Sequence, residues 1–293
     1  MAACLDQLVR TLSSDGAVSI RVLVATDVVR DAVRRHGTSP TATVALGRAL
    51  MGTLLLATEA ADGETVQIQI LGNGPLGTVT VTANSAGEVR GYAAHPHAEP
   101  GETGGALDVA RAVGLGVLRV ERNHPSWSEP YTGMIPLASG EIAQDVARYL
   151  LESEQKPSAV ALGVYLDPDG TVGAAAGYLV QGLPGADLAA LDEMEQRIGA
   201  LGQLSRRVHD GASAEDLAGE LLGKPVEALW SRVEPRFYCP CDVARVERAA
   251  TLLGRDEIRE IIRNGETLEV RCAFCAEIYH LTPDQLGAAL PDA

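Results

Sequence analysis

The 293-residue sequence is poor in aromatic side chains and in basic charge. Phe, Trp and Tyr together make up 4% of the chain, so aliphatic side chains must supply most of the hydrophobic core. Lys and Arg number 24 against 39 Asp and Glu, which leaves a formal net charge of −15. Because nucleic-acid binding depends on basic side chains that neutralise phosphates, this balance argues against nucleic acid as a partner.

Signals for membrane insertion and export are also missing. No apolar run in the sequence approaches the roughly 20 residues that a membrane-spanning helix needs. The first residues, MAACLDQLVR, have neither the basic region nor the apolar region of a secretory signal peptide. We therefore expect a cytoplasmic protein with no membrane partner.

The signatures of common enzymes are absent as well. The sequence contains no G-x-S-x-G, no H-E-x-x-H and no phosphate-binding loop, and its histidines are scattered; the pair His95 and His97 is more typical of a solvated loop. Residues 72–77, GNGPLG, match G-x-G-x-x-G, but Pro75 and the β-branched run after it predict a turn into another strand. A dinucleotide site needs a helix there. We expect no enzymatic activity.

An α+β pattern does occupy residues 1–180. Alternating or β-branched segments predict strands at residues 17–26, 65–71, 78–83, 159–166 and 171–180, and apolar segments predict helices at 41–60 and 141–152. Because consecutive strands are joined by short turns, the pattern predicts a large N-terminal domain of antiparallel sheet and helix. It does not fit a doubly wound parallel sheet.

A predicted helical linker follows, at residues 181–231. Its first helix, from residue 187 to Gly211, places apolar side chains at steps of three and four residues: Leu188, Leu191, Met194, Ile198, Leu201 and Leu204. Gly199 and Gly202 lie inside this helix, and each costs about 1 kcal/mol relative to Ala. Ser213 and Asp216 have the spacing of a capping box, which predicts a second helix. The segment is either an ordinary linker or a metastable one whose apolar stripe needs a packing partner.

Four of the five cysteines lie close together near the C-terminus. Cys239 and Cys241 form a C-x-C pair, and Cys272 and Cys275 form a C-x-x-C pair after a spacer of 30 residues. Two close pairs of thiolates suit tetrahedral Zn²⁺, so we predict one zinc ion bound by these four residues. Cys4 has no partner in sequence and is taken as incidental.

The predicted zinc domain, residues 232–293, has little else to hold it together. Asp242 is the expected N-cap of a helix that ends near Gly254, and a second helix is expected over residues 256–263. Two short strands, 267–271 and 277–281, are expected on either side of the C-x-x-C turn, followed by a last helix. Few large apolar residues fall in this region, so the metal is the expected source of stability.

Spacing alone leaves two interpretations of the zinc open. Zinc thiolates lie about 3.8 Å apart for a Zn–S bond near 2.3 Å, whereas a disulfide is about 2.05 Å long. Oxidising either pair must therefore loosen the metal, so the chemistry permits a redox switch, but most such sites are structural. A catalytic zinc fits poorly, since four thiolates leave no open position. His280 is more typical of a packed or solvated strand residue than of a fifth ligand.

Beyond the cysteines, several short motifs carry a family resemblance. They are Tyr131-Thr132-Gly133, LASGEIA at 137–143, Asp145, Tyr149, SEQ at 153–155, GYLVQ at 177–181, PGA at 184–186 and the GNGPLG turn. With C-x-C and C-x-x-C at the C-terminus, these motifs make the whole chain resemble the redox-regulated heat-shock holdase chaperones, the thirty-three-kilodalton heat-shock proteins.

The resemblance implies a redox-regulated, ATP-independent chaperone. The reduced, zinc-bound form would be an inactive monomer. Oxidation would release zinc, form disulfides Cys239–Cys241 and Cys272–Cys275, unfold the zinc domain and linker, and give a homodimer that binds unfolding proteins. The apolar stripe of the first linker helix would then bind clients or form the dimer contact. The competing interpretation is a zinc-ribbon protein whose structural zinc serves docking to a partner or to nucleic acid.

Overall fold

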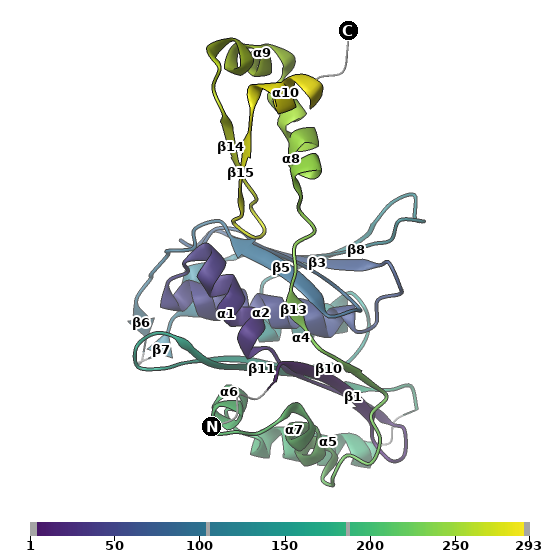
Figure 1. The fold of residues 1–293 in the computed structure, drawn as a ribbon. Coiled ribbons are helices and arrows are strands. Elements are labelled where there is room, and N and C mark those ends of the chain that lie inside the picture. The colour runs from purple at the N-terminus through teal and green to yellow at the C-terminus, as the bar shows by residue number, and fades with distance from the viewer. Residues whose placement is uncertain (1–4, 104–105, 186–187, 290–293) are drawn as a thin grey trace. The chain divides into compact units, whose positions relative to one another are not determined.

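The computed structural model describes residues 5–103, 106–185 and 188–289 (Figure 1). Contacts within the chain divide it into two units, Met1–Tyr238 and Cys239–Ala293, which are described separately below. The predicted α+β class is confirmed. The predicted division at residues 180 and 231 stays a prediction, and Cys4 lies outside the described residues.

Short connections join the elements of both units. The strands of the first unit are β1 (Gln7–Leu12), β2 (Val18–Val24), β3 (Thr65–Gly72), β4 (Val79–Asn84), β5 (Glu88–Ala93), β6 (Glu102–Thr103), β7 (Ala106–Leu107), β8 (Gly116–Asn123), β9 (Tyr131–Pro136), β10 (Ser158–Leu166), β11 (Val172–Gly182), β12 (Ser231–Val233) and β13 (Arg236–Phe237). Its helices are α1 (Thr26–His36), α2 (Pro40–Ala57), α3 (Val109–Val113), α4 (Ala143–Glu152), α5 (Leu188–Ala200), α6 (Leu204–His209) and α7 (Ala214–Leu222). The second unit has α8 (Val243–Ala250), a 3-10 turn (Thr251–Leu253), α9 (Arg255–Asn264), β14 (Leu268–Arg271), β15 (Ile278–Leu281) and α10 (Pro283–Ala289).

Two large sheets build the first unit, and β6 and β7 form a separate two-stranded sheet. The five-stranded sheet has the order β10-β11-β2-β1-β12, and the six-stranded sheet has the order β13-β5-β4-β3-β8-β9. Helices α1, α2 and α4 lie between the sheets, and α5, α6 and α7 cover the other face of the five-stranded sheet (Figure 1). The predicted hairpins β3–β4 and β10–β11 are confirmed as antiparallel pairs.

The glycine-rich segment at residues 72–77 joins β3 to β4, as the predicted turn requires. A Cβ at Gly72 would lie 2.0 Å from the Val113 carbonyl oxygen, and one at Gly74 would lie 2.3 Å from the Ala112 oxygen. Both glycines are therefore needed because the loop passes directly against the end of α3.

Helix α2 is the centre of the main core. Ser39 caps its first turn by accepting a hydrogen bond from the Ala42 amide, and Pro40 occupies the first helical position. Among the described residues, α2 is the one helix long and apolar enough to span a membrane, but 89% of its apolar window is buried inside the fold. Core helices pass the same test of length and composition, so the predicted buried helix is confirmed.

The predicted single helix after residue 187 is wrong, because the structure breaks it in two. Helix α5 ends at Ala200, Gly202 takes a left-handed φ of +69°, and α6 begins at Leu204. A residue in this conformation ends an α-helix, and glycine adopts it without strain. The second predicted helix is confirmed as α7, including the reciprocal capping hydrogen bonds of Ser213 and Asp216.

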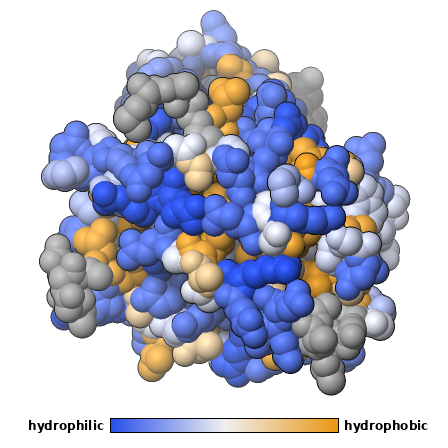
Figure 2. All heavy atoms as spheres, turned by 90° about the horizontal axis from the view of Figure 1, so that it is seen from below, coloured by the Kyte–Doolittle hydropathy of each residue, from blue (hydrophilic) through white to orange (hydrophobic). Residues whose placement is uncertain are grey.

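The apolar stripe of these helices packs on the five-stranded sheet. Met194, Leu201 and Leu204 are buried, and Ile198 is half-buried against the same cluster. The side chains of Leu188 and Leu191 lie outside the described residues. The sheet contributes Val9, Val18, Ile20, Val22, Val24 and Val180. Seen from the side of α5, α6 and α7, the surface is mostly hydrophilic with small separate apolar patches (Figure 2). Met194, Leu201 and Leu204 are therefore covered in this state.

Candidate metal centre

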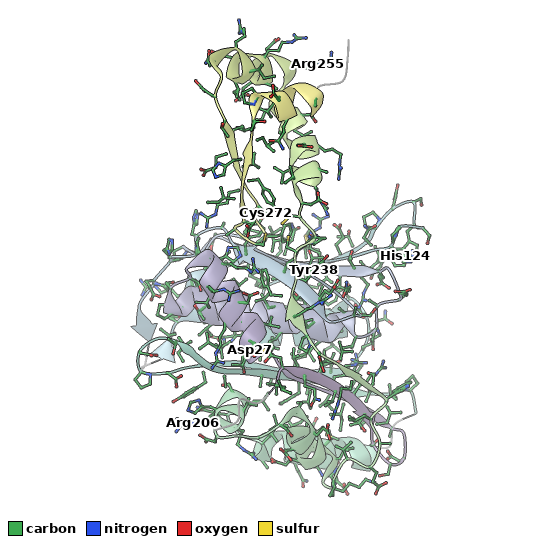
Figure 3. All side chains as sticks on the ribbon, in the orientation of Figure 1. Asp27, His124, Arg206, Tyr238, Arg255 and Cys272 are labelled. Atoms are coloured by element: carbon green, nitrogen blue, oxygen red, sulfur yellow. The ribbon has the colours of Figure 1, made fainter. Side chains whose placement is uncertain are left out.

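Two segments of the second unit carry the four cysteines. Cys239 and Cys241 lie in the loop before α8, which starts where the Asp242 carboxylate accepts a hydrogen bond from the Arg245 amide at 2.7 Å. Cys272 and Cys275 lie in the turn between β14 and β15, where Figure 3 labels Cys272. The predicted N-cap, helices and strands of this region are confirmed.

Backbone geometry shapes the C-x-x-C turn. The Cys272 amide donates to the Glu277 carbonyl at 2.9 Å, and the Ala276 amide donates to the Cys272 carbonyl at 2.8 Å. Ala276 closes the turn with a left-handed φ of +59°. An L-residue other than glycine is strained there, because its Cβ crowds the neighbouring backbone. The turn thus brings both sulfurs to the same end of the β14–β15 hairpin at a cost in backbone strain.

The four sulfur atoms form one compact cluster. All lie within 4.8 Å of one another. The Sγ atoms of Cys239 and Cys272 are 3.9 Å apart, and those of Cys241 and Cys275 are 3.3 Å apart. The sulfur atoms of a tetrahedral zinc site are separated by about 3.8 Å. The predicted ligands are therefore brought together at spacings that fit one four-coordinate soft metal ion, and all four cysteines are reduced thiols.

Burial and hydrogen bonding divide the thiols. Cys275 is buried, with 3% of its surface exposed, and the other three are half-buried. Burial raises the pKa of the Cys275 thiol. Burial also disfavours ionised Cys241, but hydrogen bonds from the Tyr279 hydroxyl and then from neighbouring thiols outweigh this effect and lower its pKa. Thiolate is the form that binds metal, so the lowered pKa of Cys241 favours coordination by its sulfur.

Tyr279 is a functional residue that the sequence reasoning missed. Its hydroxyl donates to the Cys241 Sγ and to the Cys241 carbonyl oxygen, each at 3.1 Å. The signal was present in the strand pattern. Tyr279 and the buried Leu281 are two residues apart on β15, so both side chains point to the inward face of the strand. Outer hydrogen bonds of this kind orient a metal ligand and tune its basicity.

The histidines take no part in the cluster. His280 is exposed on β15 opposite Glu269, which confirms the expected solvated strand residue. Across the described parts of the chain, the four cysteines are the one group of His, Cys, Asp or Glu side chains with the geometry of a metal site. His95 and His97 are outside it, and His124 hydrogen-bonds to Ser126 in the β8–β9 loop (Figure 3).

The second unit has only a small apolar core. Val246, Ala250, Ile258, Leu281 and Leu286 are its buried apolar side chains. Burying one such side chain contributes about 1.5–3 kcal/mol, and ordering each residue costs about as much. So few buried residues do not hold a unit of this size without a further source of stability, and a bound metal ion supplies one.

Comparison with known proteins places relatives along the full chain. A family model described as "Hsp33 protein" matches residues 6–282. A protein named 33 kDa chaperonin from Geobacter sulfurreducens is 41% identical over 283 residues, which cover 96% of this chain and 93% of the relative. Its namesake from Bacillus subtilis is 38% identical over 285 residues, covering 96% and 97%. The crystal structure of a 33 kDa chaperonin from Thermotoga maritima matches with a TM-score of 0.89 and 32% identity, over 97% of each chain.

Proposed function

Because the chain belongs to the Hsp33 family of chaperones, we propose that it is a redox-regulated, ATP-independent holdase. In the reduced state Cys239, Cys241, Cys272 and Cys275 hold one Zn²⁺, and the chain is inactive. The observation that carries this proposal is the cluster of four cysteine sulfurs within 4.8 Å of one another, in a unit with only a small apolar core. Bound zinc would keep the four sulfurs as thiolates and lend its binding energy to folding. The proposal assigns no catalytic reaction to the chain.

Oxidation is the proposed trigger. A thiolate attacks a peroxide oxygen to give a sulfenic acid and hydroxide, and the neighbouring thiolate of the pair then displaces the second hydroxide. Each pair thus loses two electrons to one peroxide. We assign the disulfides as Cys239–Cys241 and Cys272–Cys275. A disulfide near 2.05 Å is incompatible with the sulfur spacing of the metal site, so zinc leaves and the second unit loses order.

Exposure of apolar surface is the proposed consequence. The stripe comprises Leu188, Leu191, Met194 and Ile198 of α5, Leu201 in the α5–α6 connection and Leu204 of α6. The described side chains among them, Met194, Ile198, Leu201 and Leu204, pack against the five-stranded sheet. If these helices detach, both the stripe and the sheet face that it covers become apolar surface for unfolding proteins. The same surface would support a homodimer of the oxidised chain. A formal charge of −15 keeps such a protein soluble while apolar groups are exposed.

The reduced thiols support a cytoplasmic location for the proposed activity. Clustered free cysteines persist where glutathione and thioredoxin keep thiols reduced, and they respond when an oxidant overwhelms those systems. The competing function is docking of a partner or nucleic acid by a unit whose zinc is purely structural. That function predicts binding that weakens steeply with salt, whereas acidic surface charge disfavours a phosphate backbone.

Two measurements separate these functions. The first is light scattering by a heat-unfolding client, without ATP, in the presence of reduced or peroxide-treated protein. We expect suppression of scattering only by the oxidised form. The second is binding to duplex DNA between low and physiological salt. Tight, salt-sensitive DNA binding together with no suppression by either form would replace the chaperone proposal with the docking function.

The ligand assignment has its own test. We expect Cys272→Ser to lose stoichiometric, tightly bound zinc, because a hydroxyl is a far weaker zinc ligand than a thiolate. Cys4→Ser, outside the ligand set, should retain it. If Cys272→Ser holds one zinc per chain with unchanged affinity, Cys272 is not a ligand.

A further inference from the structure

The segment that precedes the second unit adds a strand to each of the two large sheets of the first unit. We call residues 230–238 the strap. Its β12 pairs antiparallel with β1 at one edge of the five-stranded sheet, and its β13 pairs parallel with β5 at one edge of the six-stranded sheet. The strap is the green segment that runs past the β13 label in Figure 1. It therefore covers one edge of each sheet.

Main-chain hydrogen bonds attach the strap to these edges. The Trp230 amide donates to the Arg10 carbonyl at 2.7 Å, the Arg236 amide to the Gly87 carbonyl at 2.9 Å, and the Tyr238 amide to the Val89 carbonyl at 2.8 Å. Backbone pairing of this kind accepts any extended segment, because it does not depend on side-chain identity. An uncovered edge of β1 or β5 would present unpaired backbone groups to such a segment.

Two half-buried side chains give the strap its specificity. Val233 and Phe237 both pack against the main core. Val233 lies opposite Leu8 in the β12–β1 register, and a Cβ added to Gly87 would lie 2.5 Å from its Cγ1. The Arg35 guanidinium lies 5.1 Å from the centre of the Phe237 ring. The edges thus present two apolar contact sites, which we call seats, for side chains four residues apart. One seat holds Val233 and the other holds Phe237.

Val233 and Phe237 each follow an arginine that pairs with a glutamate. Arg236 contacts the Glu88 carboxylate at 2.6 Å and lowers the pKa of Glu88. Arg232 forms an ion pair with Glu215 on α7. The seats therefore complement an extended segment in which a basic residue precedes an apolar one. Glu88 is on β5 itself and stays in place if the linker helices detach.

Few paired residues hold the strap. It adjoins the cysteine-containing second unit in sequence, and it forms an ion pair with the linker helix α7. Its two strands contribute three and two paired residues, and short edge strands of this kind open at low free energy. The residue after Tyr238 is the metal ligand Cys239, while Arg232 pairs with Glu215 of the linker helix α7. Loss of order on either side removes an anchor of the strap.

We propose that the strap occupies, within the folded chain, the sheet edges at which a client segment binds. It occupies the β1 and β5 edges in the reduced protein, leaves them after oxidation, and is replaced there by an extended stretch of an unfolding protein that carries basic and apolar side chains in succession. This inference rests on the proposed chaperone function and specifies where and how that function binds its clients.

A labelled peptide of residues 229–238 is the direct probe. We expect it to bind peroxide-treated full-length protein at least about tenfold more tightly than the zinc-loaded reduced protein, a difference of about 1.4 kcal/mol. A matched peptide with Val233→Asp and Phe237→Asp should not bind. Equal binding of the two peptides, or of the first peptide to both protein forms, would overturn the proposal.

Release of the strap without oxidant is the second test. Val233→Asp places a charge in an apolar seat, whereas Ser231→Asp adds the same charge at an exposed position of β12. Both zinc-loaded reduced variants are mixed with the 229–238 peptide. We expect binding to Val233→Asp and none to Ser231→Asp. Binding to neither variant or to both contradicts the proposal, provided that Val233→Asp is folded.

Hydrogen exchange keeps the inference testable if Val233→Asp does not fold. The amides of Arg236 and Tyr238 in the wild-type chain should exchange about tenfold or more faster after oxidation. Unchanged protection of both amides in oxidised protein that suppresses client scattering would show that the strap stays in place.

Competition with a client separates this inference from the proposed function. Saturating 229–238 peptide should reduce the suppression of client scattering by the oxidised protein. If the oxidised protein suppresses scattering and the peptide has no effect, the strap proposal fails and the chaperone function stands. If oxidised protein does not suppress scattering at all, both fail. If peptide binding disappears as protein concentration and dimer content rise, a second copy of the chain fills the edges and the client proposal is wrong.

Discussion

The Tyr279 hydroxyl on β15 donates a hydrogen bond to the Sγ of Cys241, 3.1 Å away and 38 residues earlier in the chain. This contact joins the two segments that carry the cysteine pairs. It also lowers the pKa of Cys241, although burial alone would raise it. The phenol thus stabilises the thiolate form that a metal ion requires.

Removing that hydroxyl should weaken metal binding. We expect Tyr279→Phe to reduce zinc affinity by about 10- to 100-fold, the usual cost of losing an outer hydrogen bond to a ligand. The measurement is zinc transfer to a chelator of known affinity. Tyr238→Phe, an exposed tyrosine of the first unit, is the control and should leave affinity unchanged. An affinity within about twofold of wild type for Tyr279→Phe would show that the hydrogen bond does not support the site.

The left-handed alanine in the C-x-x-C turn offers a stabilising substitution. Ala276 has φ +59°, which costs an L-residue about 1–2 kcal/mol and glycine nothing. Glycine also makes the unfolded chain more flexible, and this lowers the free energy of unfolding by about 0.4–1 kcal/mol, which offsets part of the relieved strain. We expect Ala276→Gly to raise the free energy of unfolding of the zinc-loaded second unit by about 1 kcal/mol in urea denaturation.

A second alanine of the same turn, Ala273, supplies the control for that substitution. Ala273 lies in the same turn without a left-handed backbone, so Ala273→Gly should give no gain and a small loss. The more stable Ala276→Gly unit should also need more peroxide for half-release of its zinc. Equal unfolding free energies for Ala276→Gly and wild type would show that the turn is not strained.

Helix α5 is open to stabilisation at its internal glycine. A Cβ added at Gly199 meets nothing within 4 Å, so Gly199→Ala should stabilise α5 by about 1 kcal/mol. Under the proposed mechanism this substitution retards detachment of the linker helices, so more peroxide is needed for client binding. Slower hydrogen exchange in α5 is the direct readout.

Gly202 provides the opposite case. It ends α5 with φ +69°, so Gly202→Ala should destabilise the linker and lower the peroxide dose needed for client binding. If Gly199→Ala and Gly202→Ala both bind clients at the wild-type dose, the stability of the linker does not set the threshold.

Much of the fold and the whole cysteine set were predictable from sequence. Hairpin turns, the Ser213 cap and the Cys239 to Cys275 spacing are local signals, and each is confirmed by position or geometry. The end of α5 was missed because the apolar period continues through Leu201 and Leu204 while Gly202 turns the backbone. The strap was missed for another reason, since Val233 and Phe237 lie in strands too short for a periodic pattern, and their pairing with β1 and β5 joins residues far apart in sequence.

Asp6 provides a test of the first unit by pH. Its carboxylate caps α1 by accepting hydrogen bonds from the Asp27 and Val28 amides at 3.0 and 2.8 Å. Burial raises its pKa from 3.8 to about 6, despite these hydrogen bonds. Because the pKa is higher in the folded state, the protonated carboxyl adds to the free energy of unfolding. This contribution is fully present below about pH 4, the pKa in the unfolded chain, and is lost as the pH rises through 6. Relative to Asp6→Asn, the wild type should lose about 3 kcal/mol of unfolding free energy between pH 4 and 7.

The comparison with Asp6→Asn needs its own control. Asp15→Asn, at an exposed turn where the pKa is lowered instead, should not show this loss of stability with rising pH. A constant difference between wild type and Asp6→Asn from pH 4 to 7 would mean that the buried carboxyl titrates normally.

Under the proposed mechanism, metal release and client binding are one event. The most direct measurement adds peroxide stepwise to zinc-loaded reduced protein and records, in the same cuvette, zinc by a metal indicator and scattering by a heat-unfolding client. We expect the reduced protein to suppress no scattering, and we expect suppression to grow in proportion to the zinc released. Full suppression before any zinc appears, or complete zinc release with no suppression, would contradict it.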